Sequence, residues 1–464
     1  MYCGYITTIK ELRKHSNADR MQCATIFTNN VIVDLSYHVG QKVVYFPTDG
    51  QLSEEYAKDN NLVRDYVPVS EFSEEEIQGK QIFNKDGVDC INIGGYMDPK
   101  KRNITALKLR GEMSDGLVMP IETLAKYTDI SKLNDGDQIN VLNGHEICRK
   151  YIPSKRPRQR TGGNGKYANK KELREKEISY PFFLEHIDTQ QLAYNQNAFK
   201  PGDVCCITLK MHGTSARTAN TVQVQKKKRN LILKKVFHLG DKEIKSFQYI
   251  SGTRRTTLRD YDGGFYGDNA FRKKWHDFFK DKLPKGICCY YEIVGYCNGN
   301  KTIMGRCSNS LVKDKAFKKQ YGDETVFSYG CDVGENDAYI YRMTMTNEDG
   351  FVVEVPWDEV QVLADMMGAK CVPTFERFIF TTWEDLIERV EKYYDGADPI
   401  GKTHVREGVV VRIENRPKFT AYKHKNDSFK ILEGIIKDNA DEPDMEEAED
   451  LIVEDAEEQC QKMM

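Results

Sequence analysis

Apolar and polar positions are arranged differently in the first third of the chain and in the rest of it. Over residues 1–148 the apolar runs are short and are separated by turn residues. The segments QKVVYF (41–46) and TALKLR (105–110) alternate between the two kinds of residue, as half-buried strands do. This pattern predicts a small β-rich N-terminal domain, for which a closed barrel is one fitting arrangement.

From residue 179 onward the apolar runs are longer, and a few segments show helical periodicity. Many strand-like runs with few helices between them are typical of an α+β domain built on antiparallel sheets. The fold class predicted for the whole chain is therefore α+β. The expected strands are 203–209, 221–225, 246–251, 287–296, 325–333, 339–345, 351–355, 407–413 and 418–423, and the expected helices are 268–281, 357–367 and 382–394.

Charge is concentrated in two segments that lack a core-forming pattern. Residues 149–176 hold eleven Lys or Arg against two acids, and residues 437–464 hold twelve acids against two lysines. Because the second segment carries ten net negative charges and the whole chain −3, the remainder carries +7, which suits a polyanionic partner. We predict a basic flexible linker over 149–178 and an acidic mobile tail over 437–464. Solvated segments without a partner are the alternative reading.

Composition sets the class of protein. A chain of 464 residues with 39% apolar residues is long enough for two or three domains with real cores. It has no apolar run long enough to span a bilayer, and its first fifteen residues lack the layout of a signal peptide. Its thirteen cysteines are odd in number and form no Cys-x-x-Cys pair, which indicates neither a disulfide framework nor a zinc site. We expect a cytoplasmic protein with no membrane partner.

Three charged residues stand in stretches that otherwise read as buried strands. Lys210 ends the apolar run VCCITL before a His-Gly turn, so its amine either reaches solvent along the strand surface or is placed to react. Glu292 lies in CCYYEIVGY, and Glu407 precedes the valines of VREGVVVRI, where alternation puts it on the face of Val409 and Val411. A carboxylate in a buried register is costly unless it meets a cation or a metal, although Glu292 at a sheet edge would avoid that cost.

Basic and aromatic pairs complete the candidates. Lys423 and Lys425 lie two residues apart on one face of a strand, where they repel each other unless an anionic group lies near them; a solvated face is the alternative. Together the candidates suit a nucleotide, since a lysine can attack a phosphate, other cations can neutralise it, carboxylates can hold a divalent metal, and an aromatic ring can stack on a base. The remaining pairs are Arg254 and Arg255 in SGTRRTTL, and Phe327 and Tyr329 in VFSYGCD.

Six short segments resemble, in chain order, the motifs of the covalent nucleotidyltransferases, the superfamily of ATP-dependent DNA ligases, RNA ligases and mRNA-capping enzymes. These segments are KMHG, SGTRR, YEIVG, FSYG, EGVVVR and KHK. The resemblance covers about residues 180–435. DNA ligases and capping enzymes carry an OB-fold after the Lys-x-Lys motif, but only 39 residues follow Lys425 here. Residues 12–26, 40–52 and 109–120 look instead like the N-terminal OB module of RNA ligases of the Naegleria and Deinococcus type, a layout that related phage proteins share.

This resemblance implies an OB-fold-like, RNA-binding domain over 1–148 and a nucleotidyltransferase (adenylation) domain of the ATP-grasp-like DNA/RNA ligase type over 179–436. It implies a monomeric ATP-dependent RNA ligase that uses Mg²⁺ or Mn²⁺ in the cytoplasm, or in the host cytoplasm if phage-encoded. Such an enzyme joins RNA 3′-OH and 5′-phosphate ends, at nicks in duplexes, through lysyl-AMP and adenylated RNA. The alternatives are an ATP-dependent DNA ligase, a capping guanylyltransferase and a catalytically inactive RNA-binding adaptor.

Site residues follow from the same resemblance. Lys210 is the nucleophile that becomes linked to AMP; it attacks as a neutral amine, and neighbouring lysines and the metal favour loss of its proton. Thr189 and Gln190 are assigned to the adenine pocket, with a helix cap as the alternative. The other implied ATP-binding residues are Arg254, Arg255, Glu292, Phe327, Tyr329, Lys423 and Lys425, and the implied metal ligands are Glu292 and Glu407.

The sequence departs from the family pattern at two positions. His212 stands where the superfamily often has an acid, and Ser215 stands where DNA ligases have arginine. The first departure puts one contact to a metal-bound water in doubt. The choice between Arg254 and Arg255 as the functional arginine stays open.

Overall fold

The structure is a computed structural model that describes residues 2–152, 178–227, 242–258, 261, 266 and 269–438. The chain divides into two compact units, Met1–Lys155 and Arg156–Met464, and the division falls inside the predicted basic linker. Most of that linker and nearly all of the predicted acidic tail lie outside the described residues. Within the described part of the chain, no helix is long and apolar enough to cross a membrane.

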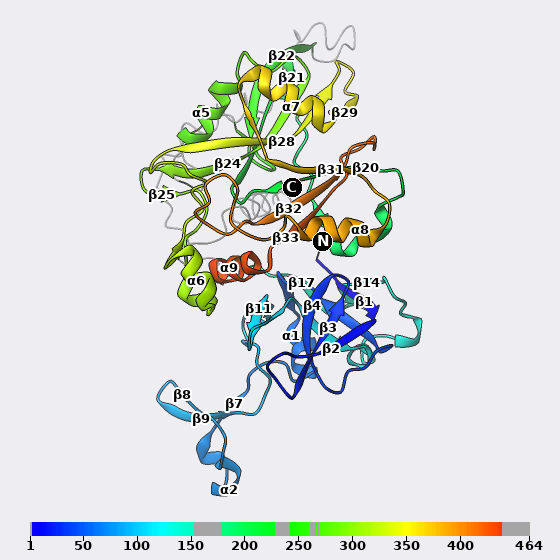
Figure 1. Cartoon of the computed structure of the whole chain (residues 1–464), viewed down its shortest axis with the longest axis vertical. Helices are drawn as coiled ribbons and strands as arrows, with labels where there is room; N and C mark the ends of the chain where they lie inside the picture. The colour runs from blue at the N-terminus through cyan, green and yellow to red at the C-terminus, as the bar shows by residue number, and fades with distance from the viewer. Residues whose placement is uncertain are drawn as a thin grey trace, which may run out of the picture. The chain divides into compact units, whose positions relative to one another are not determined.

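Short antiparallel ladders surround one apolar core in the first unit (Figure 1). Val44 and Phe46 enter this core from a sheet, and Tyr56 enters it from helix α1 (Glu54–Asp59). The predicted β-rich character is confirmed, but the predicted closed barrel is not, because the described ladders form separate sheets. Their orders are β13 (Leu117–Pro120), β5 (Lys42–Phe46), β1 (Gly4–Thr8), β14 (Gln138–Ile139); β10 (Asn103–Ile104), β6 (Gly50–Leu52), β17 (Cys148–Lys150); and β2 (Glu11–Lys14), β3 (Met21–Ile26), β4 (Asn29–Asp34).

A smaller layer leaves this core between α1 and β10. It consists of a three-stranded sheet, β7 (Tyr66–Pro68), β9 (Val88–Asn92) and β8 (Ile82–Lys85), with the short helix α2 (Glu74–Ile77). Figure 1 shows it extending away from the rest of the first unit. The first turn of α2 is capped, because the Glu76 carboxylate accepts hydrogen bonds from the backbone N–H and the hydroxyl of Ser73, both at 2.9 Å.

Arg13 on β2 and Glu112 on β12 (Glu112–Ser114) tie two ladders of the first unit together. Hydrogen bonds from Arg13 and Ser16 lower the pKa of Glu112 to about 2. Because an unfolded-state glutamate has a pKa near ~4.3, this carboxylate stabilises the fold above that value and loses its contribution as the pH falls toward 2. We therefore expect Glu112→Gln to lower the melting temperature at neutral pH, and the difference from the unaltered protein to shrink as the pH drops below about 4. Thermal melts across that range check this; a constant difference would contradict it.

The second unit carries two largely antiparallel sheets, and the chain crosses between them beside Lys210. Strand β20 (Val204–Lys210) of one sheet ends at Lys210, and β21 (Thr214–Lys227) of the other begins four residues later. The nine-stranded sheet has the order β23 (Thr257–Leu258), β22 (Lys242–Gly252), β21, β24 (Ile287–Asn298), β28 (Asn336–Thr346), β29 (Val352–Glu354), with β18 (Ile178–Ser179), β25 (Lys301–Thr302) and β30 (Lys370–Cys371) paired off this path. The five-stranded sheet has the order β19 (Gln190–Gln191), β33 (Ala421–Lys425), β32 (Gly408–Ile413), β20, β31 (Thr374–Ile379).

Helices cover these sheets with their apolar sides. Leu386 and Val390 of α8 (Trp383–Glu391) share a core with Ile207 and Val409 of the five-stranded sheet. The helices expected at 268–281, 357–367 and 382–394 are confirmed as α5 (Ala270–Phe279), α7 (Trp357–Met367) and α8, whereas α6 (Lys315–Tyr321) and α9 (Asp427–Asp438) were not expected.

The prediction of a strand over 325–333 is wrong. Strand β27 (Glu324–Thr325) stops at Thr325, and the chain then turns through Tyr329, whose φ is +51°, and Gly330, whose φ is +76°. A positive φ is incompatible with an extended strand. The apolar and aromatic residues of VFSYGCD therefore belong to a buried turn.

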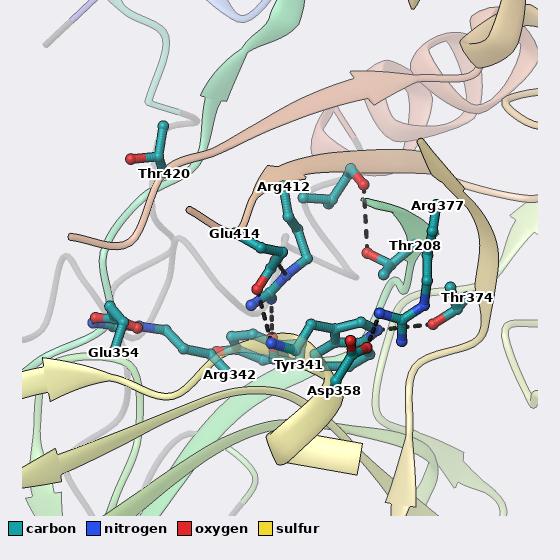
Figure 2. Close-up of polar contacts among 12 residues, drawn as sticks. Thr208, Tyr341, Arg342, Glu354, Asp358, Thr374, Arg377, Arg412, Glu414 and Thr420 are labelled. Carbon is teal, nitrogen blue, oxygen red and sulfur yellow. Dashed lines mark hydrogen bonds and ion pairs between the residues drawn. The ribbon is translucent and has the colours of Figure 1, made fainter. Parts of the chain in front are cut away.

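A buried arginine, Arg412, connects the two large sheets of the second unit (Figure 2). Arg412 on β32 donates to Glu414 Oε1 at 2.7 Å and to the carbonyl oxygen of Tyr341 on β28. Arg342, the next residue on β28, is paired with Glu354 on β29. The hydrogen bond from Arg412 to Tyr341 holds β32, and with it the carboxylate that precedes this strand, against the nine-stranded sheet.

Candidate active site

Two lysines lie in one row of the five-stranded sheet. Lys210 on β20 is opposite Gly408 on β32, and Gly408 is opposite Lys425 on β33. Gly408 has a φ of +145°, and a Cβ there would collide with the carbonyl oxygen of His424. Glycine is therefore required between the two lysines, because backbone atoms of His424 and Lys425 occupy the space that a side chain would take.

The Glu407 carboxylate lies near both lysines. Its Oε1 lies 2.7 Å from Lys210 Nζ and 3.9 Å from Lys425 Nζ, and its side chain is 2% exposed. The prediction that Glu407 shares the face of Val409 and Val411 is wrong, because β32 begins at Gly408 and the positive φ there breaks the alternation. Burial raises the pKa of Glu407 above its ordinary value, and the two lysines oppose that rise.

Lys425 has a second carboxylate. It donates to both oxygens of Glu433 on α9, at 2.7 and 2.6 Å. Lys423 lies one row further along β33, opposite Val410, and is half-buried. Of the lysines expected near Lys210, Lys425 is the one that shares a carboxylate with it. Because the Glu407 carboxylate lies near both ammonium groups, they experience attraction to it as well as mutual repulsion.

An aromatic cluster encloses the turn that follows Lys210. The His212 ring centroid lies 4.7 Å from that of Phe327 and 4.9 Å from that of Phe429, and the His212 backbone N–H donates to the Tyr329 hydroxyl at 2.6 Å. Phe327 and Tyr329 are 1% and 3% exposed. Their stacking on a base stays a prediction, and it requires this cluster to open. In the structure as it stands, both rings order the turn beside the lysine.

Glu292 lies in the middle of the nine-stranded sheet, not at its edge. It is opposite Ser215 on β21 and Tyr339 on β28, and it accepts a hydrogen bond from the Ser215 hydroxyl at 3.1 Å. Its burial is therefore accompanied by a polar contact, as a buried carboxylate requires. Tyr339 was missed from the sequence, since only the strand register shows that its ring neighbours this carboxylate.

Both candidate arginines lie near one acid. Arg254 is paired with Asp188, and Arg255 Nη2 lies 4.0 Å from the same carboxylate. Arg217, which is buried, donates to the carbonyl oxygens of Phe183, Thr253 and Arg255 at 3.0–3.1 Å and so fixes the turn that presents both arginines. Arg254 is the more enclosed of the two, with a side chain 17% exposed against 36% for Arg255.

Thr189 and Gln190 lie beside β33, the strand that carries Lys423 and Lys425. Gln190 pairs in parallel with Tyr422 of β33, and Gln191 is opposite Lys423. The helix-cap alternative does not apply, because Gln191 caps the following short 3₁₀ helix, Leu192–Tyr194. The adenine-pocket role of both residues stays a prediction.

The sequence also did not predict three other residues of the site, for different reasons: Asp188, Arg217 and Glu433. Asp188 stands next to the predicted Thr189, so its position in EHIDTQQ was an available signal. Glu433 lies in DSFKILEGIIKD, whose helical periodicity was overlooked, and Arg217 resembles any other polar letter of a long strand.

The two predicted metal ligands supply part of a site. Among the residues that the structure describes, no group of three or more His, Cys, Asp or Glu side chains is arranged to hold a metal. Glu407 Oε2, however, is buried and has no hydrogen-bond partner in the described part of the chain. This arrangement fits Mg²⁺ or Mn²⁺, which bind one or two carboxylates and complete their coordination with water and phosphate oxygens.

Comparison with known families agrees with this geometry. Residues 203–432 match the family model described as RNA ligase, and this segment contains Lys210, Glu292, Glu407 and Lys425. No curated protein matches the chain.

Several solved structures of Naegleria gruberi RNA ligase share the fold. A lysine-to-alanine variant with ATP and Mn gives a TM-score of 0.53 at 15% identity, covering 94% of this chain and 99% of that chain. A glutamate-to-alanine variant with AMP and Mn gives 0.53 at 14% identity, covering 95% and 100%, and the enzyme with PPi gives 0.51 at 14% identity, covering 92% and 98%. At this identity the likeness concerns the fold. The segment 203–432 therefore belongs to the RNA ligase family.

Proposed function

We propose that this protein is an ATP-dependent RNA ligase that joins RNA 3′-OH and 5′-phosphate ends through lysyl-AMP and adenylated RNA. The observation that carries the proposal is the 2.7 Å contact between Lys210 Nζ and the buried Glu407 carboxylate, in a row with Lys425. A lysine that only reaches solvent has no need of such a partner. The matched RNA ligase family and the ATP and Mn bound by the Naegleria enzyme support the same reading.

The first step transfers AMP to Lys210. Glu407, whose pKa burial raises, is placed to take the proton from the amine, because a carboxylate of higher pKa is a better proton acceptor. The neutral nitrogen then forms a bond to the α-phosphorus of ATP, and the bond from that phosphorus to pyrophosphate breaks. Lys425, in the row of Lys210, and Lys423, further along β33, neutralise phosphate charge. When bound, a divalent ion adds Lewis-acid stabilisation of that charge.

The second and third steps use RNA. The RNA 5′-phosphate accepts AMP from Lys210, and the 3′-OH then attacks the adenylated phosphate and releases AMP. We assign contacts with the RNA duplex to the β-rich first unit, as an OB-fold-like module over 1–148, and place the enzyme at nicks, as a monomer in the cytoplasm. The net charge of +7 outside residues 437–464 supports a polyanionic substrate.

Incubation with α-labelled ATP and Mg²⁺, followed by a denaturing gel, tests the first step. We expect a labelled protein band that pyrophosphate discharges and that Lys210→Ala abolishes, because the label sits on that nitrogen. RNA bound without any label would instead support an inactive adaptor, and labelling by GTP rather than ATP would support a capping enzyme.

Nicked duplexes that differ only in the sugar of the 3′-OH strand test the substrate. We expect the labelled enzyme to seal ribonucleotide nicks faster than all-deoxy nicks. Equal rates would make the protein a DNA ligase by activity and would overturn the RNA assignment while leaving the first step intact.

A further inference from the structure

Helix α9 touches the active-site row from outside the sheet. Its Phe429 packs against His212, and Glu433, one helical turn later on the same face, meets Lys425. The family match ends at residue 432, so Glu433 lies just beyond it. One face of α9 therefore contacts both the turn after Lys210 and the second lysine of the row.

Two ammonium groups interact with the same oxygen atom of Glu407. Its Oε1 is 2.7 Å from Lys210 Nζ and 3.9 Å from Lys425 Nζ. Lys425 is 8% exposed and Glu433 is 9% exposed, so water does little to balance either charge. A buried cation is strongly drawn to the nearest carboxylate. With Glu433 neutralised, Lys425 is therefore expected to move toward Glu407 and compete there with Lys210.

We propose that Glu433 is a positioning residue for the transfer of AMP to Lys210: it holds Lys425 away from Glu407 and thereby keeps Glu407 for Lys210. The proposal rests on the function proposed above. Glu433 accepts two hydrogen bonds from the Lys425 ammonium, at 2.7 and 2.6 Å, and so fixes the position of this cation. A cation fixed in advance does not have to reorganise as charge develops on the phosphate.

A double-mutant cycle on the single-turnover rate of self-adenylation, at saturating ATP, tests this role. We expect Glu433→Gln to lower the rate about 10- to 100-fold. In a Lys425→Met background the same change is expected to lower it less than about twofold, because a residue that acts through Lys425 has nothing left to position. Glu433→Asp keeps the charge and should recover part of the rate.

Asp427→Asn is the matched control. It removes an exposed carboxylate of the same helix, one that is paired with Lys430, and its rate should equal that of the unaltered protein. Equal losses from Glu433→Gln in both backgrounds, or no loss in either, would overturn the proposal, since α9 would then act through general packing or not at all. If Glu433→Gln does not fold, the cycle is made with Glu433→Ala, for which equal losses with and without Lys425 overturn the proposal.

The outcomes separate this inference from the proposed function. An unaltered protein that takes no label from ATP refutes the function. An unaltered protein that takes the label, with additive losses in the cycle, refutes only the role of Glu433.

Discussion

Glu407→Gln is expected to slow the self-adenylation of Lys210 by about 10³-fold. The amide has nearly the same shape but accepts no proton at neutral pH, and it removes the charge that lies 2.7 Å from Lys210 Nζ. Both effects act on the step in which the amine becomes a nucleophile. Single-turnover labelling with α-labelled ATP, at several ATP concentrations, separates this loss of rate from any loss of ATP affinity.

The fold should survive this change. Lys210 is 20% exposed, so water can solvate its charge when the carboxylate is gone, and loss of a buried negative charge removes a desolvation cost. Glu376→Gln, on β31 of the same sheet, is the matched control, because Glu376 is paired with Arg389 on α8 and should leave the rate unchanged. A Glu407→Gln rate within tenfold of the unaltered protein would exclude Glu407 as the proton acceptor.

The sequence predicted the sheets of the second unit better than it predicted their ends. Long apolar runs such as 287–296 and 339–345 fall within the strands β24 and β28, because ladder pairing and burial both favour them. Residues 325–333 have similar letters but fold as a turn around Tyr329. The difference lies in tertiary packing against His212 and His404, which no local pattern contains.

The first unit shows a similar limit. Alternation over 41–46 correctly predicts a strand, here β5, but closure of a barrel depends on which strands pair with one another. That information is long-range: β5 pairs with β1 and with β13, more than seventy residues later. Short apolar runs therefore identify strands without specifying their partners.

Within the candidate site, the sequence predicted which residue types are present, but it did not predict on which face of the sheet each side chain lies. Alternation put Glu407 with Val409, but the positive φ of Gly408 turns the carboxylate toward Lys210. The same glycine sits between the two lysines of the row. A glycine in VREGVVVRI indicates a break in the strand, and only the structure shows that the carboxylate before it lies near two cations.

Arg217 is the residue whose loss should damage both fold and activity. Its guanidinium lies under the turn that carries Arg254 and donates to three carbonyl oxygens, those of Phe183, Thr253 and Arg255. Arg217→Met leaves these acceptors without their donor, at roughly 1 kcal/mol or more for each, so we expect the second unit to lose about 3 kcal/mol of stability.

Arg217→Lys is the informative comparison because it keeps the charge. A single ammonium donates from one point and does not reproduce the fork that reaches three separate carbonyls. We expect it to recover less than half of the lost stability, measured by denaturant unfolding, and to leave the self-adenylation rate about tenfold or more below that of the unaltered protein, because the turn presenting Arg254 stays loose. Full recovery of both quantities would show that the charge of Arg217 matters and its three-way contact does not. A recovery of stability without a recovery of rate would instead separate the two roles and place the geometry of this turn directly in the adenylation step.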